Sequence, residues 1–533
     1  MSAPLPVRAD IATSPTPSIP PGTSPSSPAL GSAGFGWTRI DRSAIGLVAL
    51  ALAVIYLLTY TTDPATPGNN TRFPLGWWGW WDQSQYIRSA RAFAVHLLDP
   101  EQHWYPLGYS LLLSLFARGS GGHAALLPDL LCLLLAFAGF CRFATRVGVR
   151  PAWGAPLFLL GTEGSQSVRG LWAEPWNSTL SAALLWWLLS LTADLLRDRG
   201  PAAASGRKPA ALLFALGVLA VLVCFTRPTD ALIVGIWGLL LLWFGLRSGS
   251  FRILGVGWLA AGGVLAAVPL LWLWIAVYGF RLSPYMMWSR SLGFSLHGLW
   301  WKSYLLLVAP APWFPGDRSL LERLPWLFPG IAAMTVLPLI VAGRARMLLA
   351  MLSLMIVPYS LLFFSYVDLV PSGLWRFHNA HYFKWTFPGL LLLGAVLLRA
   401  VAFGPRRAPV AALAVLSLLS CIRLVPRAAH GDAPVWMAQH AMPVAGWSPE
   451  HESELGLRDA AGMHHNIHDI RILPGDDGWR AIGMAAPLHG ALSPVSPSGS
   501  VGAPWSGEPR WTMRFHLGAP AWLGTWSPHL PRP

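Results

Sequence analysis

Two polar segments of an otherwise apolar chain carry side chains suited to acid–base and phosphate chemistry. Residues 77–116 include Asp82, a carboxylate that could accept a proton from a hydroxyl group. Residues 373–385 include Arg376 and Lys384, whose guanidinium and ammonium groups suit a phosphate. A carboxylate and two such cations could together accept a proton and hold a phosphate group.

Each of these residues also has a simpler interpretation. The spacing of apolar residues after Asp82 predicts a short amphipathic surface helix, and Asp82 could merely cap it, with the neighbouring Trp residues anchoring the loop at the membrane interface. Arg376 and Lys384 could anchor their loop to lipid headgroups in the same way. The sequence leaves both interpretations open.

Three further charged residues at the ends of apolar runs are weaker candidates. Glu174 could be a second carboxylate or a charge placed favourably at a helix start. Arg227 could contact a ligand or form a salt-bridged turn with Asp230. Asp129, near the end of its apolar run, is expected to be solvated or paired rather than to relay protons.

Metal and nucleic-acid functions are not favoured by the sequence. His464, His465 and His468 supply too few ligands for a metal site. We therefore expect no metal site and no certain cofactor, and any dependence on a divalent metal stays open. The net charge of +14 does not indicate nucleic acid, because the basic residues punctuate apolar runs.

The composition places these residues in a polytopic membrane protein. Of 533 residues, 54% are hydrophobic and only 12% are charged, about half the charged share of soluble domains. All four cysteines fall within or at the ends of apolar runs, which favours core packing over a disulfide framework. We expect an all-α fold with about 11 transmembrane helices, near 43–60, 122–141, 151–168, 176–195, 210–226, 229–246, 253–279, 326–343, 346–366, 386–402 and 408–425.

The distribution of basic residues predicts the orientation of these spans. If residues 105–116 form a short re-entrant or interfacial helix, five basic clusters share the cytoplasmic side. These are Arg142/Arg146/Arg150, Arg197/Arg199/Arg207/Lys208, Arg247/Arg252, Arg344/Arg346 and Arg406/Arg407. The long loops, which should carry the function, then lie on the extracytoplasmic side.

Three regions follow from this topology. Residues 1–42 are predicted to be a disordered, Pro/Ser-rich cytoplasmic tail, and residues 43–425 the transmembrane domain. Residues 426–533 form a small Pro/Gly/Trp-rich extracytoplasmic tail with no sustained strand or helix pattern. We expect a multi-pass integral protein of a bacterial inner (plasma) membrane.

Several motifs resemble those of the GT-C class of membrane glycosyltransferases, in particular protein-mannosyltransferase family 39 and the aminoarabinose-transferase-like members. They are the acidic first outer loop, the segments QYIRSARAF and WYPLGYSLL, and shorter motifs at 172–175, 226–228 and 376–384. The resemblance covers residues 43–425. This chain departs from the pattern in its single acidic residue, Asp82, where many relatives have a pair, and in Pro-Leu where a double Pro is common.

The resemblance implies a GT-C-like fold and transfer of a sugar from a polyprenyl-phosphate-linked donor to an acceptor hydroxyl on the extracytoplasmic face, with inversion at the anomeric carbon. The acceptor would be a lipid, a glycan or a protein. Asp82 and Glu174 would be the catalytic residues. The substrate- and phosphate-binding residues would be Arg376, His378, His381, Lys384, Arg227 and Tyr105.

Two other functions remain as alternatives. A transporter or lipid flippase would need interrupted helices paired near the membrane midplane, and the candidate polar residues instead lie at span ends on one side. A polymerase or ligase of lipid-linked glycans would share the large outer loops. Identifying the donor headgroup would separate it from monosaccharide transfer.

Overall fold

The computed structural model describes residues 38–423, except 72–73, 80, 121, 197–206, 295, 297–298, 311–317, 367–368, 370–372, 377 and 404–406, together with eight short strands after residue 425. Within helices, the side chains of residues 81, 207, 291–292, 300–301, 376 and 417–423 are outside this description. Most of the predicted tail 1–42 also lies outside it. Residues 39–42 are a correction to that prediction, because they form the first turn of a helix that Thr38 and Asp41 cap reciprocally.

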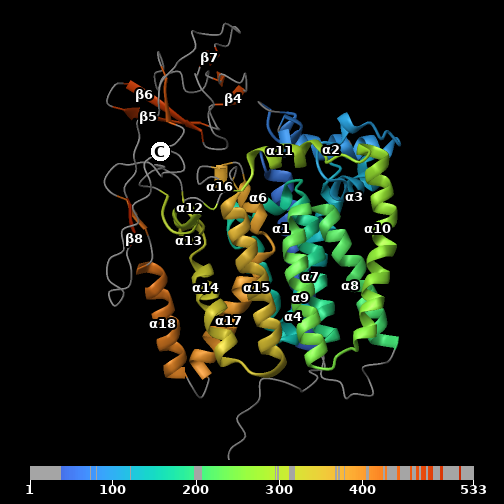
Figure 1. Cartoon of the computed structure of the whole chain (residues 1–533), viewed down its shortest axis with the longest axis vertical. Coiled ribbons are helices and arrows are strands. Elements are labelled where there is room, and N and C mark those ends of the chain that lie inside the picture. The colour runs from blue at the N-terminus through green and yellow to red at the C-terminus, as the bar shows by residue number, and fades with distance from the viewer. Residues whose placement is uncertain are drawn as a thin grey trace, which may run out of the picture.

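The described chain before residue 424 is helical (Figure 1). The α-helices are α1 (Arg39–Thr62), α2 (Trp81–Ala94), α3 (Leu107–Ala117), α4 (Leu126–Arg146), α5 (Pro151–Glu163), α6 (Gln166–Ala173), α7 (Asn177–Leu195), α8 (Arg207–Thr226), α9 (Ala231–Arg247), α10 (Val256–Tyr278), α11 (Pro284–Leu292), α12 (Leu299–Leu307), α13 (Leu320–Arg323), α14 (Phe328–Ile340), α15 (Gly343–Ser365), α16 (Gly373–Arg376), α17 (Thr386–Phe403) and α18 (Arg407–Arg423). Short 3-10 turns join several of them, including η6 (Pro325–Leu327) before α14 and η7 (Asn379–Phe383) before α17.

The C-terminal region contains short strands that the sequence pattern did not predict. They are β1 (Pro426–Ala428), β2 (Ala441–Val444), β3 (Gly456–Arg458), β4 (His464–Asn466), β5 (Ile470–Gly475), β6 (Gly478–Gly483), β7 (Ser493–Val495) and β8 (Phe515–Leu517). They pair antiparallel in three small sheets of order β1-β8, β2-β6-β5 and β4-β3-β7. Strands of three to six residues are too short to show a recognisable alternation.

Among the described residues, eight helices are long and apolar enough to cross a membrane, so the chain is a multi-pass membrane protein. They coincide with eight of the eleven predicted spans. The other three predicted spans are too long, because the helices at these positions are shorter. The span expected at 151–168 is interrupted after Glu163, and those at 326–343 and 408–425 correspond to shorter apolar helices in the described chain.

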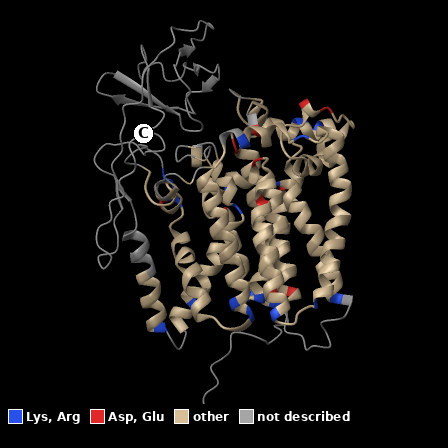
Figure 2. Cartoon of the chain, viewed as in Figure 1, with Lys and Arg blue, Asp and Glu red and all other residues tan. Residues whose placement is uncertain are grey.

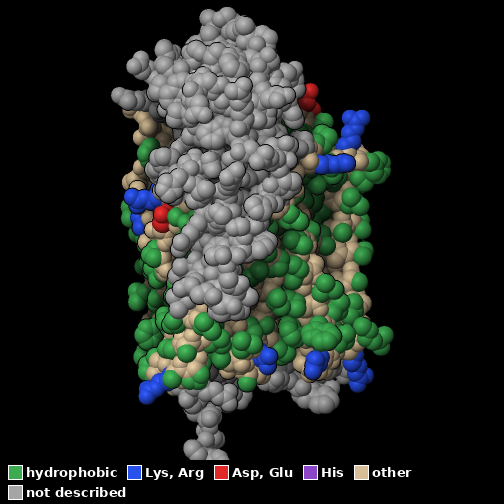
Figure 3. Space-filling view, turned by 60° about the vertical axis from the view of Figure 1, so that its left-hand side comes forward, with side chains coloured by type: hydrophobic (Ala, Val, Ile, Leu, Met, Phe, Trp, Pro, Cys, Tyr) green, Lys and Arg blue, Asp and Glu red, His purple; other side chains and the backbone are tan. Residues whose placement is uncertain are grey.

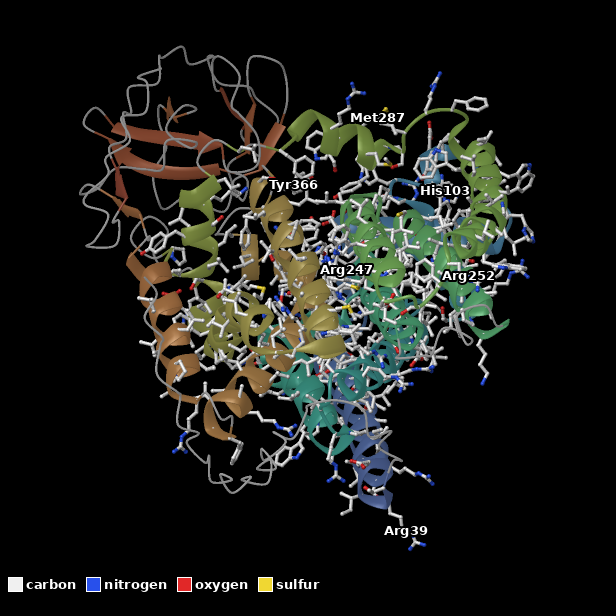
Figure 4. All side chains as sticks on the ribbon, turned by 60° about the horizontal axis from the view of Figure 1, so that its bottom comes forward. Arg39, His103, Arg247, Arg252, Met287 and Tyr366 are labelled. Carbon is white, nitrogen blue, oxygen red and sulfur yellow. The ribbon has the colours of Figure 1, made fainter. Side chains whose placement is uncertain are left out.

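The charges divide the molecule into two ends. In the ribbon of Figure 2, Lys and Arg positions (blue) line the lower ends of the helices and also occur toward the upper end, whereas Asp and Glu positions (red) lie mostly toward the upper end. In Figure 4, Arg247 and Arg252 lie toward the first end, and His103, Met287 and Tyr366 lie toward the opposite one. We call these the basic end and the loop end. This division agrees with the predicted grouping of the basic clusters.

The surface between the two ends is apolar. Figure 3 shows a green belt of hydrophobic side chains above a rim of Lys and Arg. Helix α10 is the most exposed candidate span, with only 11% of its apolar window buried inside the protein. Its outward Trp258, Leu265 and Trp272 are more than half exposed, as expected where lipid chains take the place of protein neighbours.

The first polar loop forms two short helices at the loop end (Figure 1). Helix α2 has the amphipathic pattern expected, with Ile87 and Ala90 fully buried and Arg88 and Arg91 exposed. Helix α3 has only 11 residues, about 17 Å, too short to cross about 30 Å of hydrocarbon. The preference for a short helix over a span at 105–116 is thereby supported.

Glycines allow neighbouring helices to pack closely. A Cβ added at Gly262 of α10 would lie 2.0 Å from the Phe214 carbonyl oxygen of α8, and one at Gly217 would lie 2.0 Å from the Leu259 carbonyl oxygen. A Cβ at Gly330 of α14 would similarly lie 2.2 Å from the Leu390 carbonyl oxygen of α17. Small residues at helix contacts are typical of membrane bundles, because they let backbones approach.

Candidate functional site

Asp82 is held in an aromatic cluster at the loop end. It is the second residue of α2, and its carboxylate accepts a hydrogen bond from the Tyr105 hydroxyl. The Tyr105 ring stacks on Tyr86 at 4.4 Å and contacts Tyr285 at 4.5 Å between centroids. Burial raises the pKa of Asp82, and the hydrogen bond from Tyr105 opposes that shift. Asp82 thus contacts Tyr105, a residue distant in the sequence that was also predicted to belong to the site.

Arg227 stands beside the same cluster from the junction of α8 and α9. Its guanidinium donates a hydrogen bond to the Tyr359 hydroxyl at 3.0 Å, and its Nε lies 3.8 Å from Asp230 Oδ1. The guanidinium carbon also lies over the ring of Tyr382 at 5.2 Å. This confirms the predicted contact with Asp230. The arginine is only 4% exposed.

The pKa of Tyr86 connects Asp82 with Arg227. Burial, Tyr285 and the charge of Asp82 raise this pKa, whereas the charge of Arg227 lowers it. Tyr86 is therefore close enough to both groups to be influenced by them electrostatically. A carboxylate and a buried guanidinium thus both lie near one tyrosine.

Glu174 forms a second acidic centre with His378. It follows α6, is fully buried, accepts a hydrogen bond from Trp176 Nε1 at 3.0 Å, and pairs with His378 Nδ1. The backbone of His378 is left-handed, with φ 58°, which costs energy for a residue with a Cβ. Burial lowers the pKa of His378, but the charges of Glu174 and Asp63 outweigh this effect and raise it overall.

Asp63 is a residue of this centre that the sequence interpretation missed. A Cβ added at Gly170 of α6 would meet Glu174 Oε1 at 3.8 Å and Asp63 Oδ2 at 3.9 Å, so the two carboxylates flank one glycine. Burial raises the pKa of Asp63, as does the nearby charge of Glu174. Its position directly after the first apolar run was the only available signal.

His381 and Lys384 come from η7 and the turn before α17, and both contact the first turn of α7. His381 Nδ1 lies 2.9 Å from Ser178 Oγ, and its ring stacks on Trp176 at 3.8 Å. The Lys384 ammonium donates to Thr179 Oγ1 at 2.6 Å and lies 5.5 Å from the Trp172 ring. Both side chains are buried.

Burial also sets the protonation of these two residues. It lowers the pKa of His381 well below the ordinary value, together with the charges of Arg227 and Lys384, so this imidazole is neutral at pH 7. Burial lowers the pKa of Lys384 to about 7, although the charges of Asp129 and Glu174 oppose that shift. Lys384 is therefore a titratable cation, and His381 can only offer neutral hydrogen bonds to a ligand.

Two other predictions can now be placed. Asp129 is fully buried and paired, since the Tyr109 hydroxyl lies 2.9 Å from both of its carboxylate oxygens. Arg376 ends α16, two residues before His378, and its side chain lies outside the described residues. Within the described part of the chain, His, Cys, Asp and Glu form no group of three that could hold a metal ion.

No protein-family model, curated protein or solved structure matches the chain. The chemical interpretation therefore depends on the residues themselves. The described contacts bring Asp82 and Tyr105 together, and they bring Glu174 together with His378. The charges of Glu174 and Arg227 influence the pKa of Lys384, and the charge of Arg227 influences the pKa of His381. Lys384 therefore lies near Glu174 and Arg227, and His381 lies near Arg227. Buried acids and cations gather at one end of an apolar helical body.

Proposed function

We propose that the chain is an integral-membrane glycosyltransferase of GT-C type that uses a polyprenyl-phosphate-linked sugar. Asp82 accepts the proton of the acceptor hydroxyl, and Arg227 and Lys384 hold the phosphate of the donor. The observation that carries the proposal is the gathering at the loop end of the Asp82 carboxylate, which is bound by the Tyr105 hydroxyl, with the buried side chains of Arg227 and Lys384. The acceptor is a lipid, a glycan or a protein, and the membrane a bacterial inner membrane.

In the proposed reaction, Asp82 accepts a proton and the cations stabilise the leaving phosphate. The acceptor oxygen forms a bond to the anomeric carbon, its proton passes to the Asp82 carboxylate, and the bond from the anomeric carbon to the phosphate oxygen breaks. The phosphate leaves with both bonding electrons, and nearby cations stabilise that charge. A base with a raised pKa keeps more affinity for the proton, which favours its transfer near neutral pH. Attack opposite the leaving group inverts the anomeric carbon.

The start of α7 supports phosphate binding at Lys384. Ser178 and Thr179 in its first turn contact His381 and Lys384, so the positive end of the helix dipole lies beside the ammonium group. Phosphates bind at such helix starts because unpaired backbone N–H groups and the dipole both favour an anion. The burial of Lys384 would strengthen its attraction for a phosphate that displaces water.

Helix α9 offers a surface for the prenyl chain. The helix begins four residues after Arg227, and near its other end Leu239, Leu242, Trp243, Leu246 and Arg247 line a shallow, open hollow on its surface. Between them, Gly235 and Gly238 have open space where a Cβ would be. A long apolar chain anchored at Arg227 could follow this face through the membrane.

Substitution of Asp82 tests the proposed base. We expect Asp82→Asn to lower sugar transfer by roughly 10²–10⁴-fold, the usual contribution of a general base. The measurement is transfer by the purified full chain from a panel of polyprenyl-phosphate sugars, with membrane insertion checked in parallel.

The matched control is Asp99→Asn. Asp99 is an exposed carboxylate of the same loop, and its described hydrogen bond is to the backbone N–H of Glu101. Transfer should stay near the wild-type rate in this variant. A fully active, correctly inserted Asp82→Asn protein would remove Asp82 as the base.

A further inference from the structure

Trp176 lies between the Glu174–His378 pair and the residues that contact the start of α7. It directly precedes α7 and is buried. Its indole N–H donates to Glu174 Oε2 at 3.0 Å, and its ring stacks nearly parallel on the His381 ring, with 3.8 Å between the centroids. One side chain thus contacts both the second acidic centre and the histidine one turn before the proposed phosphate-binding lysine, Lys384.

The segment that carries His381 docks on the start of α7 along one face. Positions 378, 381 and 384 are three residues apart, which is the repeat of a 3-10 helix such as η7, so their side chains share one side. Three contacts join this side to the chain around the first turn of α7: Glu174 with His378, Ser178 with His381, and Thr179 with Lys384. Trp176 lies in the middle of this row.

The ring of Trp176 fixes the plane of the His381 imidazole. The contact with Ser178 involves a single ring nitrogen, around which the imidazole can still turn. A stacked ring removes this freedom, because it holds the whole face of the imidazole. The indole is itself held, since it packs in the buried cluster with Tyr86 and Tyr105. The His381 imidazole therefore rests on a rigid support.

The position of His381 in turn affects Lys384. The backbone N–H of Lys384 donates to the His381 carbonyl oxygen at 3.3 Å, so the two residues belong to one turn. The ammonium group of Lys384 then donates to Thr179. Burial lowers the pKa of Lys384, and the charge of Glu174, whose carboxylate accepts the Trp176 N–H, opposes that shift. Both the ring and the N–H of Trp176 thus act on the lysine through other residues.

We propose that Trp176 is a positioning residue for phosphate binding at Lys384. It holds the imidazole of His381 in one plane and thereby keeps the ammonium group of Lys384 against Thr179 at the start of α7. Trp176 itself does not touch the phosphate. The inference rests on the proposed function, because it takes Lys384 to be a ligand of the donor phosphate. Such support matters because a site loses affinity when its ligands are free to move.

The test measures the binding of inorganic phosphate to the full chain by calorimetry, in non-ionic detergent at pH 6, where Lys384 is charged. Trp176→Met removes the ring but fills much of its space, and Trp176→Phe keeps a ring for the stack. The matched control is Trp237→Met. Trp237 is also buried, and its indole N–H donates to Thr192 Oγ1 at 2.9 Å. Thr192 lies 13 residues beyond Thr179 on α7, about 20 Å away.

We expect Trp176→Met to weaken phosphate binding at least tenfold. Trp176→Phe should bind within about threefold of the wild type, because the stack on His381 is kept, and Trp237→Met should match the wild type. In a His381→Leu background, Trp176→Met should cause less than about a twofold further loss, because Trp176 acts through that histidine. A general loss of stability would instead lower binding by the same factor in both backgrounds.

Three results would overturn the proposal: wild-type binding by Trp176→Met, an equal loss in Trp237→Met, or losses of Trp176→Met and His381→Leu that multiply. If Trp176→Met fails to insert, His381→Leu alone decides. A loss of at least tenfold is expected in that variant, and unchanged binding would exclude any role through His381. A wild-type chain that binds no phosphate would instead remove the phosphate site of the proposed function, so the two failures are distinguishable.

Discussion

At the scale of single residues, the two proposed phosphate-binding cations differ in how firmly they hold their charge. Arg227 stays protonated at any physiological pH because guanidinium groups do not titrate there. Lys384 is buried against Thr179 and Trp172, and its pKa falls to about 7. A phosphate site made of both residues should therefore weaken as the pH rises, through Lys384 alone.

The pH dependence of transfer should show both titrating groups. Activity should rise with pH as Asp82 loses its proton, at a pKa that burial raises, and fall through about pH 7 as Lys384 loses its charge. Transfer rates at saturating and at limiting donor, measured between pH 5 and 9, provide the profile.

Lys384→Arg isolates the falling limb of that profile. A guanidinium keeps its charge, so the decline near pH 7 should disappear if the variant folds. An unchanged falling limb in a folded Lys384→Arg protein would assign that titration to another residue. If the variant fails to insert, the wild-type profile provides the test. A wild-type activity that does not decline up to pH 9 would show that Lys384 does not control transfer in this way.

The residue types predicted the candidate site residues better than they predicted the residues that contact them. Asp82, Glu174, His378, His381 and Lys384 were recognisable because charged residues are rare in this chain. Tyr359 and Asp63 were not, because tyrosine is ordinary within an apolar helix and one acid after a span has no distinguishing pattern. Their roles arise from contacts between segments up to hundreds of residues apart, which a single sequence does not encode visibly.

At the scale of helices, hydropathy located the spans but not their interruptions. The run 151–168 is continuous in apolar character, yet the chain leaves the helix at Glu163 and resumes at Gln166. Gly164 and Ser165 at that point weaken a helix, although glycine also occurs within intact helices of this protein, such as α10. Tertiary packing decides between the two outcomes.

The close approach of α8 and α10 gives a prediction at the same scale. Gly262→Ala should lower the free energy of unfolding by about 1–3 kcal/mol, because the new methyl group would overlap the Phe214 carbonyl oxygen. Gly257→Ala, on the same helix with open space around its Cβ position, should be neutral. Thermal unfolding in detergent compares the two. Equal stability of both variants would contradict the described packing.

At the scale of the whole molecule, one end carries the basic rim, and most of the acids lie toward the other end (Figure 2). If the basic rim is cytoplasmic, the reaction takes place on the far side of the membrane. The separation of the two ends could be predicted from the sequence, because the positive-inside rule depends on the number of basic residues in each loop and not on contacts between segments.

Cysteine labelling in intact cells tests the orientation. In a background without the native cysteines, Glu101→Cys at the loop end should react with a membrane-impermeant maleimide, and Ser248→Cys at the basic end should react only after lysis. Both positions are exposed, so accessibility to the reagent reflects the side of the membrane. The reverse pattern would place the candidate site in the cytoplasm.

The shortness of two helices has a consequence for the surrounding lipids. Helices α5 and α14 have 13 residues each, about 20 Å, and both pack against α17, which follows Lys384. Apolar segments this short favour local thinning of a hydrocarbon layer about 30 Å thick. The leaflet would dip beside this flank, and a lipid carried in it would bring its phosphate down to the depth of the buried lysine without leaving the bilayer.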